Sequence, residues 1–211
     1  MLRNNRRLLV VGLDGAGKST LVQQLGGAAF DKQDQIGGCA ISAVEVGKLQ
    51  FDVWDAGGED RLRTYWRHYY TGSHAVAFVV DSADRARLAV AVEEFRGVVR
   101  DHQLAQTVIL IIANKQDVAG AATVDEISTM FAVTELVQQH RVIGTSATAS
   151  GEGLSKALEW LGEVCVSFFL LSGITAALFH RQRTGEGQLV DCAMLRCATW
   201  MTNQTMIIGS R

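Results

Sequence analysis

A glycine-rich loop near the start of the chain constrains its fold more than any other feature. An apolar run over residues 8–11 (LLVV) leads directly into residues 12–19 (GLDGAGKS), and a helical pattern follows from Thr20. The loop matches the pattern GxxxxGK[ST] in the strand–loop–helix setting that this pattern requires. In that setting, backbone N–H groups turn inward around phosphate oxygens, and the positive end of the helix dipole faces them. We therefore expect a polyphosphate-binding loop, with a plain glycine-rich turn as the alternative.

Each part of this loop has an expected role in holding a nucleoside triphosphate. The glycines let the backbone approach the phosphates closely, and Lys18 supplies a positive charge to the β- and γ-phosphates. The hydroxyl of Ser19 is an expected Mg²⁺ ligand. Taken alone, the loop leaves ATP and GTP both open. The residues expected to contact the nucleotide here are Gly12, Leu13, Asp14, Gly15, Ala16, Gly17, Lys18, Ser19 and Thr20.

Short β-branched runs alternate with amphipathic stretches up to about residue 163. The predicted strands span residues 8–11, 51–54, 76–80, 108–112 and 141–144, and the predicted helices span residues 18–25, 87–100, 125–137 and 153–164. Continuous apolar runs such as VILII at 108–112 suit strands that are buried on both faces. This order predicts an α/β fold with a doubly wound, mostly parallel sheet, whose ligands lie at the carboxyl ends of the strands. The chain has no proline, which excludes proline-rich linkers and docking segments.

A second motif, NKQD at residues 114–117, follows the predicted strand VILII and bears on the choice of base. The carboxylate of Asp117 can accept hydrogen bonds from both donors on the guanine edge, whereas adenine offers no such pair. Lys115 is expected to lie along the base plane, and Asn114 to tie the loop to the phosphate side. Guanine is therefore the predicted base, with a solvated loop as the alternative for this motif in isolation. Further backbone contacts, to the guanine O6, are expected from Ser146 and Ala147.

The segment after the predicted strand at residues 51–54 is suited to a metal ion and a third phosphate. Asp55 ends this strand, and a carboxylate opposite the phosphate loop holds Mg²⁺, commonly through water. The absence of a side chain at Gly58 lets its backbone N–H approach the γ-phosphate. Loss of that contact on hydrolysis would release the segment that follows, which is an order–disorder switch.

Five segments occur in the order and spacing of a known family, over about residues 6–164. They are GLDGAGKST, VWDAGGEDRLRTYWRHYY, VVDSADR, NKQD and SGEGLSKALEWL. In these segments the chain resembles the ADP-ribosylation-factor and Arf-like small GTPases. The resemblance implies a switch between GTP and GDP with Mg²⁺, and partners that are exchange factors, GTPase-activating proteins and effectors. It also implies a cytoplasmic protein that can be peripheral at an internal membrane, with vesicle transport among the family's roles. Trp54 and Tyr69 match two positions of that family's aromatic effector patch, with ordinary packing as the alternative.

Three positions depart from the family's pattern. Glu59 stands where the family usually has glutamine. A carboxamide can accept from the attacking water and donate toward the γ-phosphate, whereas a carboxylate cannot donate and repels that anion. We therefore expect weak GTP hydrolysis, in which Lys18 and Mg²⁺ stabilise the spread charge and Glu59 is a weakened catalytic residue. Gln35 stands where a threonine usually closes over Mg²⁺, so it is a weak candidate metal ligand, and Gly38 replaces a usual aromatic residue.

Composition and the start of the chain exclude several other functions. The formal net charge of −2 gives no indication of nucleic acid as a partner. The four cysteines show no metal-ligand spacing, which favours a reducing compartment. Met1 is followed by Leu2, so we expect neither a myristoyl anchor nor the membrane-coupled activation that the family uses.

Residues 165–211 are expected to be an appended fragment that follows a GTPase domain at residues 1–164. Residues 172–194 resemble an internal segment of family III CoA-transferases, but residues 161–164 (LGEV) lack that family's catalytic aspartate. We expect an irregular or helical appendage without transferase activity. The uncharged run over residues 164–179 is shorter than the roughly 18–20 residues that cross a bilayer. A buried helix or hairpin is the main interpretation of that run, and membrane association through it stays open.

These observations lead to one main hypothesis and two alternatives. The main hypothesis is a Mg²⁺-dependent, GTP-binding switch of the Arf-like type with slow or impaired hydrolysis. The first alternative is a guanine-nucleotide-binding scaffold that does not cycle. The second alternative is a fragment of a CoA-handling enzyme.

Overall fold

The computed structural model describes residues 6–26, 34–36, 38–46, 49–146, 160 and 178–185. The chain divides into two compact units, Met1–Leu161 and Gly162–Arg211. The first unit contains the sheet and all of the residues predicted to bind a nucleotide.

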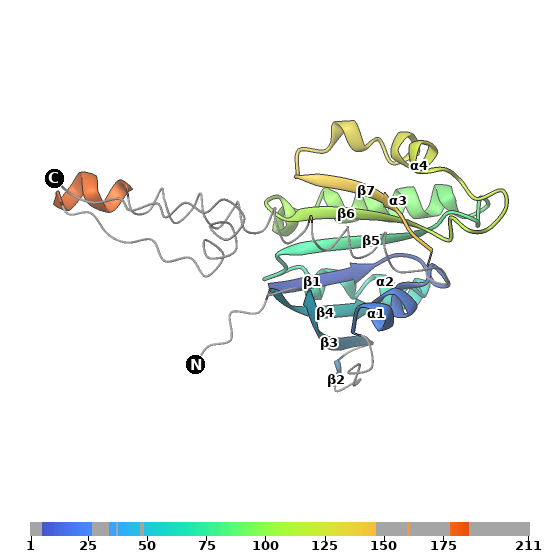
Figure 1. Cartoon of the computed structure of the whole chain (residues 1–211), viewed down its shortest axis with the longest axis horizontal. Helices are drawn as coiled ribbons and strands as arrows, with labels where there is room; N and C mark the ends of the chain where they lie inside the picture. The colour runs from blue at the N-terminus through green and yellow to red at the C-terminus, as the bar shows by residue number, and fades with distance from the viewer. Residues whose placement is uncertain are drawn as a thin grey trace. The chain divides into compact units, whose positions relative to one another are not determined.

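A seven-stranded sheet forms the centre of the described part of the first unit. Its strands are β1 (Arg6–Val11), β2 (Asp34–Ile36), β3 (Cys39–Val46), β4 (Leu49–Ala56), β5 (Ala75–Asp81), β6 (Val108–Asn114) and β7 (His140–Gly144). Their order across the sheet is β2-β3-β4-β1-β5-β6-β7 (Figure 1). The strands β4, β1, β5, β6 and β7 run parallel to one another. The strands β3 and β2 extend the sheet beyond β4 with antiparallel pairing. The predicted α/β class and the mostly parallel sheet are confirmed.

The five predicted strands are confirmed, and each lies within two residues of its observed bounds. The sequence did not indicate β2 and β3. In β3 the buried residues Cys39, Ser42 and Val44 are small or mixed in polarity, so no apolar alternation marks the strand. Backbone pairing with β4 along its whole length, from Cys39 opposite Ala56 to Val46 opposite Leu49, defines it instead. Such pairing between neighbouring strands is not a local property of the sequence.

Helices cover the sheet because its central strands are apolar on both faces. They are α1 (Lys18–Gly26), α2 (Asp60–Arg63), α3 (Leu88–Val99) and α4 (Val124–Met130), with 3₁₀ turns η2 (Trp66–Tyr69), η3 (His102–Leu104) and η4 (Val133–Glu135). Every residue of β6 is buried, which requires cover on each side. In Figure 1, α1 and α3 lie on opposite faces of the sheet. On the α3 face, Phe78 of β5 packs edge-on against Phe95 and Phe131 in the main hydrophobic core.

The predicted helices at residues 18–25 and 87–100 are confirmed as α1 and α3. The predicted helix at residues 125–137 is wrong in its second half, because α4 ends at Met130 and a separate turn, η4, follows. Ala132 has a left-handed backbone, with φ of 48°, which stops the helix. The bend buries both Phe131 and Val133 in the core. The predicted helix at residues 153–164 lies outside the described residues, apart from Trp160.

In the second unit the structure describes residues 178–185. Residues 178–184 are helical, and Gly185 follows with a φ of +76°. The N–H of Gly185 donates to the carbonyl of Arg181 at 2.8 Å, which caps the helix end. In the part of the chain that the structure describes, no helix is both long and apolar enough to cross a membrane.

Replacement of Phe78 by alanine tests the core on which the sheet depends. Phe78 is fully buried and contacts the rings of Trp66, Phe95 and Phe131. We expect Phe78→Ala to lower the free energy of unfolding by about 3–5 kcal/mol, because the cavity cannot fully collapse. Urea denaturation measures this loss. In the matched control, exposed Val90→Ala on α3, the change stays within about 0.5 kcal/mol. Equal effects of the two variants would contradict this assignment of the core.

Candidate functional site

The glycine-rich loop joins β1 to α1 and has the backbone that its glycines permit. Gly12, Gly15 and Gly17 have φ of 141°, 73° and 91°, values that residues with a side chain rarely adopt. A Cβ at Gly12 would lie 2.2 Å from the carbonyl oxygen of Val79, so this position has no room for one. The loop therefore packs directly against the end of β5, with its backbone close to the sheet.

Lys18, the first residue of α1, is buried beneath this loop. Its ammonium group donates to the carbonyls of Gly12 and Leu13 at 2.9 and 2.8 Å. Its side chain is therefore folded back across the inside of the loop. Burial lowers the pKa of Lys18, while the nearby carboxylates of Asp55 and Asp14 act in the opposite direction. A buried cation that is held by backbone carbonyls suits a phosphate group as an additional partner.

The next residue of α1 is bonded to the end of β4. The hydroxyl of Ser19 donates to Oδ2 of Asp55 at 2.5 Å. These two oxygens are hard ligands of the kind that Mg²⁺ prefers. The described residues contain no group of three or more His, Cys, Asp or Glu side chains that could hold a metal ion. This pair therefore fits a Mg²⁺ ion that takes most of its ligands from phosphates and water, as Mg²⁺ commonly does.

A buried amide ties the loop after β6 to the phosphate loop. Nδ2 of Asn114 donates to the carbonyl of Ala16 at 2.8 Å, and Oδ1 of the same amide accepts from the hydroxyl of Thr145 at 3.1 Å. A Cβ at Gly17 would lie 2.4 Å from the Asn114 amide nitrogen, so the close approach requires glycine. Asn114 thus joins three segments that are far apart in the sequence.

The same loop has a second support, from the end of β5. Lys115 has a left-handed backbone, with φ of 65°, and its ammonium group pairs with Asp81 at 2.6 Å. The N–H of Gln116 donates to the carbonyl of Thr145, which holds the residues after β7 beside this loop. Asp117 and Ser146 lie in these two loops, and their contacts with a base stay predictions. Ala147 lies outside the described residues.

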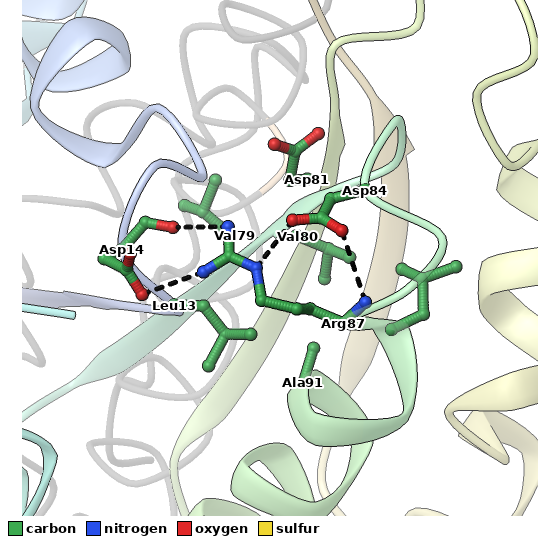
Figure 2. A pocket seen from close by; sticks show the side chains of 9 residues that line it. Leu13, Asp14, Val79, Val80, Asp81, Asp84, Arg87 and Ala91 are labelled. Carbon is green, nitrogen blue, oxygen red and sulfur yellow. Dashed lines mark hydrogen bonds and ion pairs between the residues drawn. The ribbon is translucent and has the colours of Figure 1, made fainter. Parts of the chain in front are cut away.

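The outer side of the phosphate loop is bound to α3 by a chain of charges. Figure 2 shows the guanidinium group of Arg87 between the side chains of Asp14 and Asp84. Arg87 donates to Asp14 Oδ1 at 3.0 Å and to Asp84 Oδ2 at 2.6 Å. The bond to Arg87 holds the pKa of Asp84 below its usual value. The side chain of Asp14 therefore fixes the loop to the start of α3, while the backbone of Asp14 belongs to the expected phosphate contacts.

The segment after β4 lies directly against the phosphate loop. The N–H of Asp14 donates to the carbonyl of Gly58 at 3.2 Å. A Cβ at Gly58 would lie within 2.5 Å of Gly12, Asp14 and the ammonium group of Lys18, so there is no room for a side chain. The next residue, Glu59, forms an exposed ion pair with Arg61 at 2.8 Å.

Three other predicted residues lie on the remaining strands and turns. Trp54 of β4 and Tyr69 of η2 are in contact, with ring centroids 5.9 Å apart. The guanidinium group of Arg7 lies over the Trp54 ring at 3.5 Å. Tyr69 is almost fully buried, so packing explains much of its environment. Gln35 lies in β2, where its backbone pairs with Ala40 of β3, and its role as a metal ligand stays a prediction.

Sequence reasoning missed several residues that build this site. They are Arg63, Asp81, Arg87 and Thr145. Asp81 is the last residue of β5 and Asp55 lies next to the last residue of β4, so the same argument from strand ends could have found Asp81. The two arginines have no local signal for this site, because the phosphate-loop residue that both contact, Asp14, lies 49 and 73 positions away in the sequence.

The fold and the site define a class of protein. A GxxxxGK[ST] loop between β1 and α1, with an NKQD loop at the carboxyl end of β6, is the arrangement of a P-loop small GTPase.

The chain belongs to the ADP-ribosylation factor family, whose family model matches residues 1–165. It is 38% identical to ADP-ribosylation factor-like protein 1 of Drosophila melanogaster over 162 residues, which cover 76% of this chain and 89% of that protein. It is also similar to the solved structure of the Arl6 BBS3 small GTPase of Trypanosoma brucei with the bound nucleotide analogue GppNp. That match has a TM-score of 0.69 and 29% identity, and covers 77% of this chain and 98% of the other.

Membership of this family makes the chain a GTP-binding switch that takes GTP or GDP with Mg²⁺. A second family model, CoA-transferase family III, matches residues 128–210. That match overlaps the end of the GTPase family match, so residues 128–165 are similar to both families.

Replacement of Asp117 tests the predicted choice of base. We expect Asp117→Asn to lower the affinity for GDP on the order of 100-fold, because two hydrogen bonds to a charged acceptor are weakened. Competition between GDP and ADP for the purified protein measures this effect. The control, Asp125→Asn, changes an exposed carboxylate on α4 and leaves the affinity unaltered. An unchanged preference for guanine in Asp117→Asn would refute the role of this residue.

Proposed function

We propose that this chain is an Arf-like GTP switch whose own hydrolysis of GTP is slow. The observation that carries the proposal is the position of Glu59. It follows Gly58, whose carbonyl accepts a hydrogen bond from the phosphate loop, so Glu59 begins at the edge of the phosphate site. Its carboxylate is paired with Arg61.

The contacts of the phosphate loop support a role for each residue in nucleotide binding. Lys18 binds the β- and γ-phosphates, and the backbone from Gly12 to Thr20 surrounds them. Ser19 binds Mg²⁺ directly, and Asp55 binds it through water. When bound, Mg²⁺ neutralises charge on the phosphate oxygens. On the base side, Asn114 holds the loop in place, Lys115 lies along the base, and Asp117 reads the guanine edge.

The slow hydrolysis follows from the chemistry of a carboxylate at position 59. Water attacks the terminal phosphate in line, and a neighbouring side chain must orient that water. A carboxylate can accept a hydrogen bond from the water, but it has no N–H to direct at the anionic phosphate. The ion pair with Arg61 offsets part of its charge. Since both side chains of this pair are more than half exposed, it contributes little to stability.

Replacement of Glu59 by glutamine tests this proposal. We expect Glu59→Gln to increase the single-turnover rate of GTP hydrolysis on the order of 100-fold, within the range for a positioned side chain acting on a reacting group. GDP affinity is expected to stay the same, because no atom of Glu59 is assigned to nucleotide binding. The matched control is Glu93→Gln, an exposed ion-paired glutamate on α3, which leaves both quantities unchanged.

The alternative function, a scaffold that binds guanine nucleotide without cycling, predicts a different outcome of the same experiment. If Glu59→Gln gives no gain in hydrolysis although GTP is bound, the defect lies elsewhere in the site and the scaffold is favoured. Nucleotide extracted from the purified protein adds a second readout. A slow switch retains GTP, whereas a fast one retains GDP.

The partners of such a switch are an exchange factor, a GTPase-activating protein and effectors, as the family implies. Of the two aromatic residues matched to an effector patch, Trp54 is the one that is only partly buried, so we propose that it contributes to an effector surface with Tyr69 packed against it. For residues 165–211 we propose an appendage that has no CoA-transferase activity, because residues 161–164 offer no catalytic aspartate. Binding of an acyl-CoA to the full chain with turnover of its thioester would overturn that part of the proposal.

A further inference from the structure

Two successive peptide groups of the segment after β4 are held by side chains from α2 and η2. The indole N–H of Trp66 donates to the carbonyl of Gly57 at 2.8 Å. Nε of Arg63 donates to the carbonyl of Gly58, also at 2.8 Å. Both side chains are well buried, with 2% of Trp66 and 10% of the Arg63 side chain exposed. Trp66 has no role in the site described above, and Arg63 is placed there only by its contacts with Gly58 and Asp14.

A fixed carbonyl also fixes the N–H of the same peptide group. In a trans peptide the C=O of one residue and the N–H of the next lie in one plane and point in opposite directions. All peptide bonds in the described residues are trans. The bond from Trp66 to the Gly57 carbonyl therefore sets the direction of the Gly58 N–H. Similarly, the bond from Arg63 to the Gly58 carbonyl sets the direction of the Glu59 N–H.

The peptide that Trp66 fixes lies at the inner edge of the phosphate loop. Gly58 is buried, and a Cβ on it would lie 2.4 Å from both the Gly12 carbonyl and the ammonium group of Lys18. A rotation of this peptide thus changes which backbone group is presented beside Lys18. A ligand bound to Lys18 would therefore gain or lose a hydrogen bond according to the direction of the Gly58 N–H.

Arg63 links this peptide to the phosphate loop and to α3. Besides Gly58, its guanidinium group contacts Asp60 at 2.6 Å, Glu94 at 3.2 Å and Asp14 at 3.5 Å. The planar fork of arginine serves several partners at once, which a lysine ammonium on a flexible stem does less well. Trp66 is fixed by edge-on packing against Phe78 in the core, with centroids 6.3 Å apart. Both donors are therefore held rigidly.

We propose that Trp66 and Arg63 are positioning residues that make the site sense a third phosphate. Trp66 aims the Gly58 N–H at the terminal phosphoryl group of a nucleoside triphosphate, and Arg63 prevents the following peptide from turning. The diphosphate lacks that group, so these two side chains set the preference for triphosphate over diphosphate. This inference rests on the proposed function as a guanine-nucleotide switch.

Conservative variants of the two residues test the inference. Trp66→Phe removes the indole N–H and keeps an aromatic ring in the core, and Arg63→Lys keeps the charge and loses the fork. We expect each to reduce the ratio of the affinities for a non-hydrolysable GTP analogue and for GDP about tenfold, with GDP affinity unchanged within twofold. Competition against a fluorescent GDP on the full-length protein measures both affinities. Trp160→Phe and Arg96→Lys are the matched controls, because the Trp160 ring lies beside the guanidinium group of Arg141 and Arg96 is paired with Glu93 on α3.

The midpoint of thermal unfolding of each variant in saturating GDP shows whether the variant is folded. It therefore separates a changed nucleotide preference from a general loss of stability. A reduced ratio with a folded, GDP-bound variant supports the inference. An equal loss of affinity for both nucleotides, or an unchanged ratio, overturns it. If Trp66→Phe does not fold, Arg63→Lys decides the question. Failure of the wild-type chain to bind guanine nucleotides would instead overturn the proposed function, so the two failures are distinguishable.

Discussion

The amide of Asn114 crosses from the end of β6 to the carbonyl of Ala16 in the phosphate loop. This hydrogen bond is fully buried, so its loss would leave polar groups of both loops without partners in the protein interior. It joins the two segments that the proposed function assigns to the two ends of one nucleotide. Gly17 permits the approach, because any side chain there would meet the amide. The distance between the loop expected to contact the phosphates and the loop expected to contact the base is therefore set by the hydrogen bond from Asn114 to Ala16 and by the absence of a side chain at Gly17.

Other contacts to this loop go mainly through its backbone. Lys18 bonds to two carbonyls of the loop, and the carbonyl of Gly58 accepts from the N–H of Asp14. Arg87 then fixes the loop to α3 through the side chain of Asp14. The shape of the phosphate loop is therefore fixed mainly by bonds to its own main-chain atoms. The segment after β4 is held by other side chains, Trp66 and Arg63. Such separation suits a switch, in which one part moves relative to a constant site.

The sequence predicted the features that depend on local chemistry. The phosphate loop could be located from the spacing of its glycines, Lys18 and Ser19, and the left-handed backbone at Gly15 and Gly17 explains why glycine is needed there. The buried strands β5 and β6 could be predicted from their unbroken apolar runs. By contrast, β3 is a strand because it pairs with β4, and its own residues do not show this. The early end of α4 depends on the burial of Phe131 and Val133, which is decided by the rest of the core.

The predicted site was incomplete for a related reason. A motif identifies residues at fixed spacing, but the residues that orient the segment after β4 act through backbone carbonyls. Trp66 looks like an ordinary core residue and Arg63 like a surface charge until the structure shows what each one bonds. The consequence bears on Glu59. Binding of a third phosphate depends, in our proposal, on peptides that Trp66 and Arg63 hold, whereas hydrolysis depends on one exposed side chain. A change at position 59 can therefore slow turnover and leave recognition of the triphosphate intact, because the two properties rest on different atoms of the same loop.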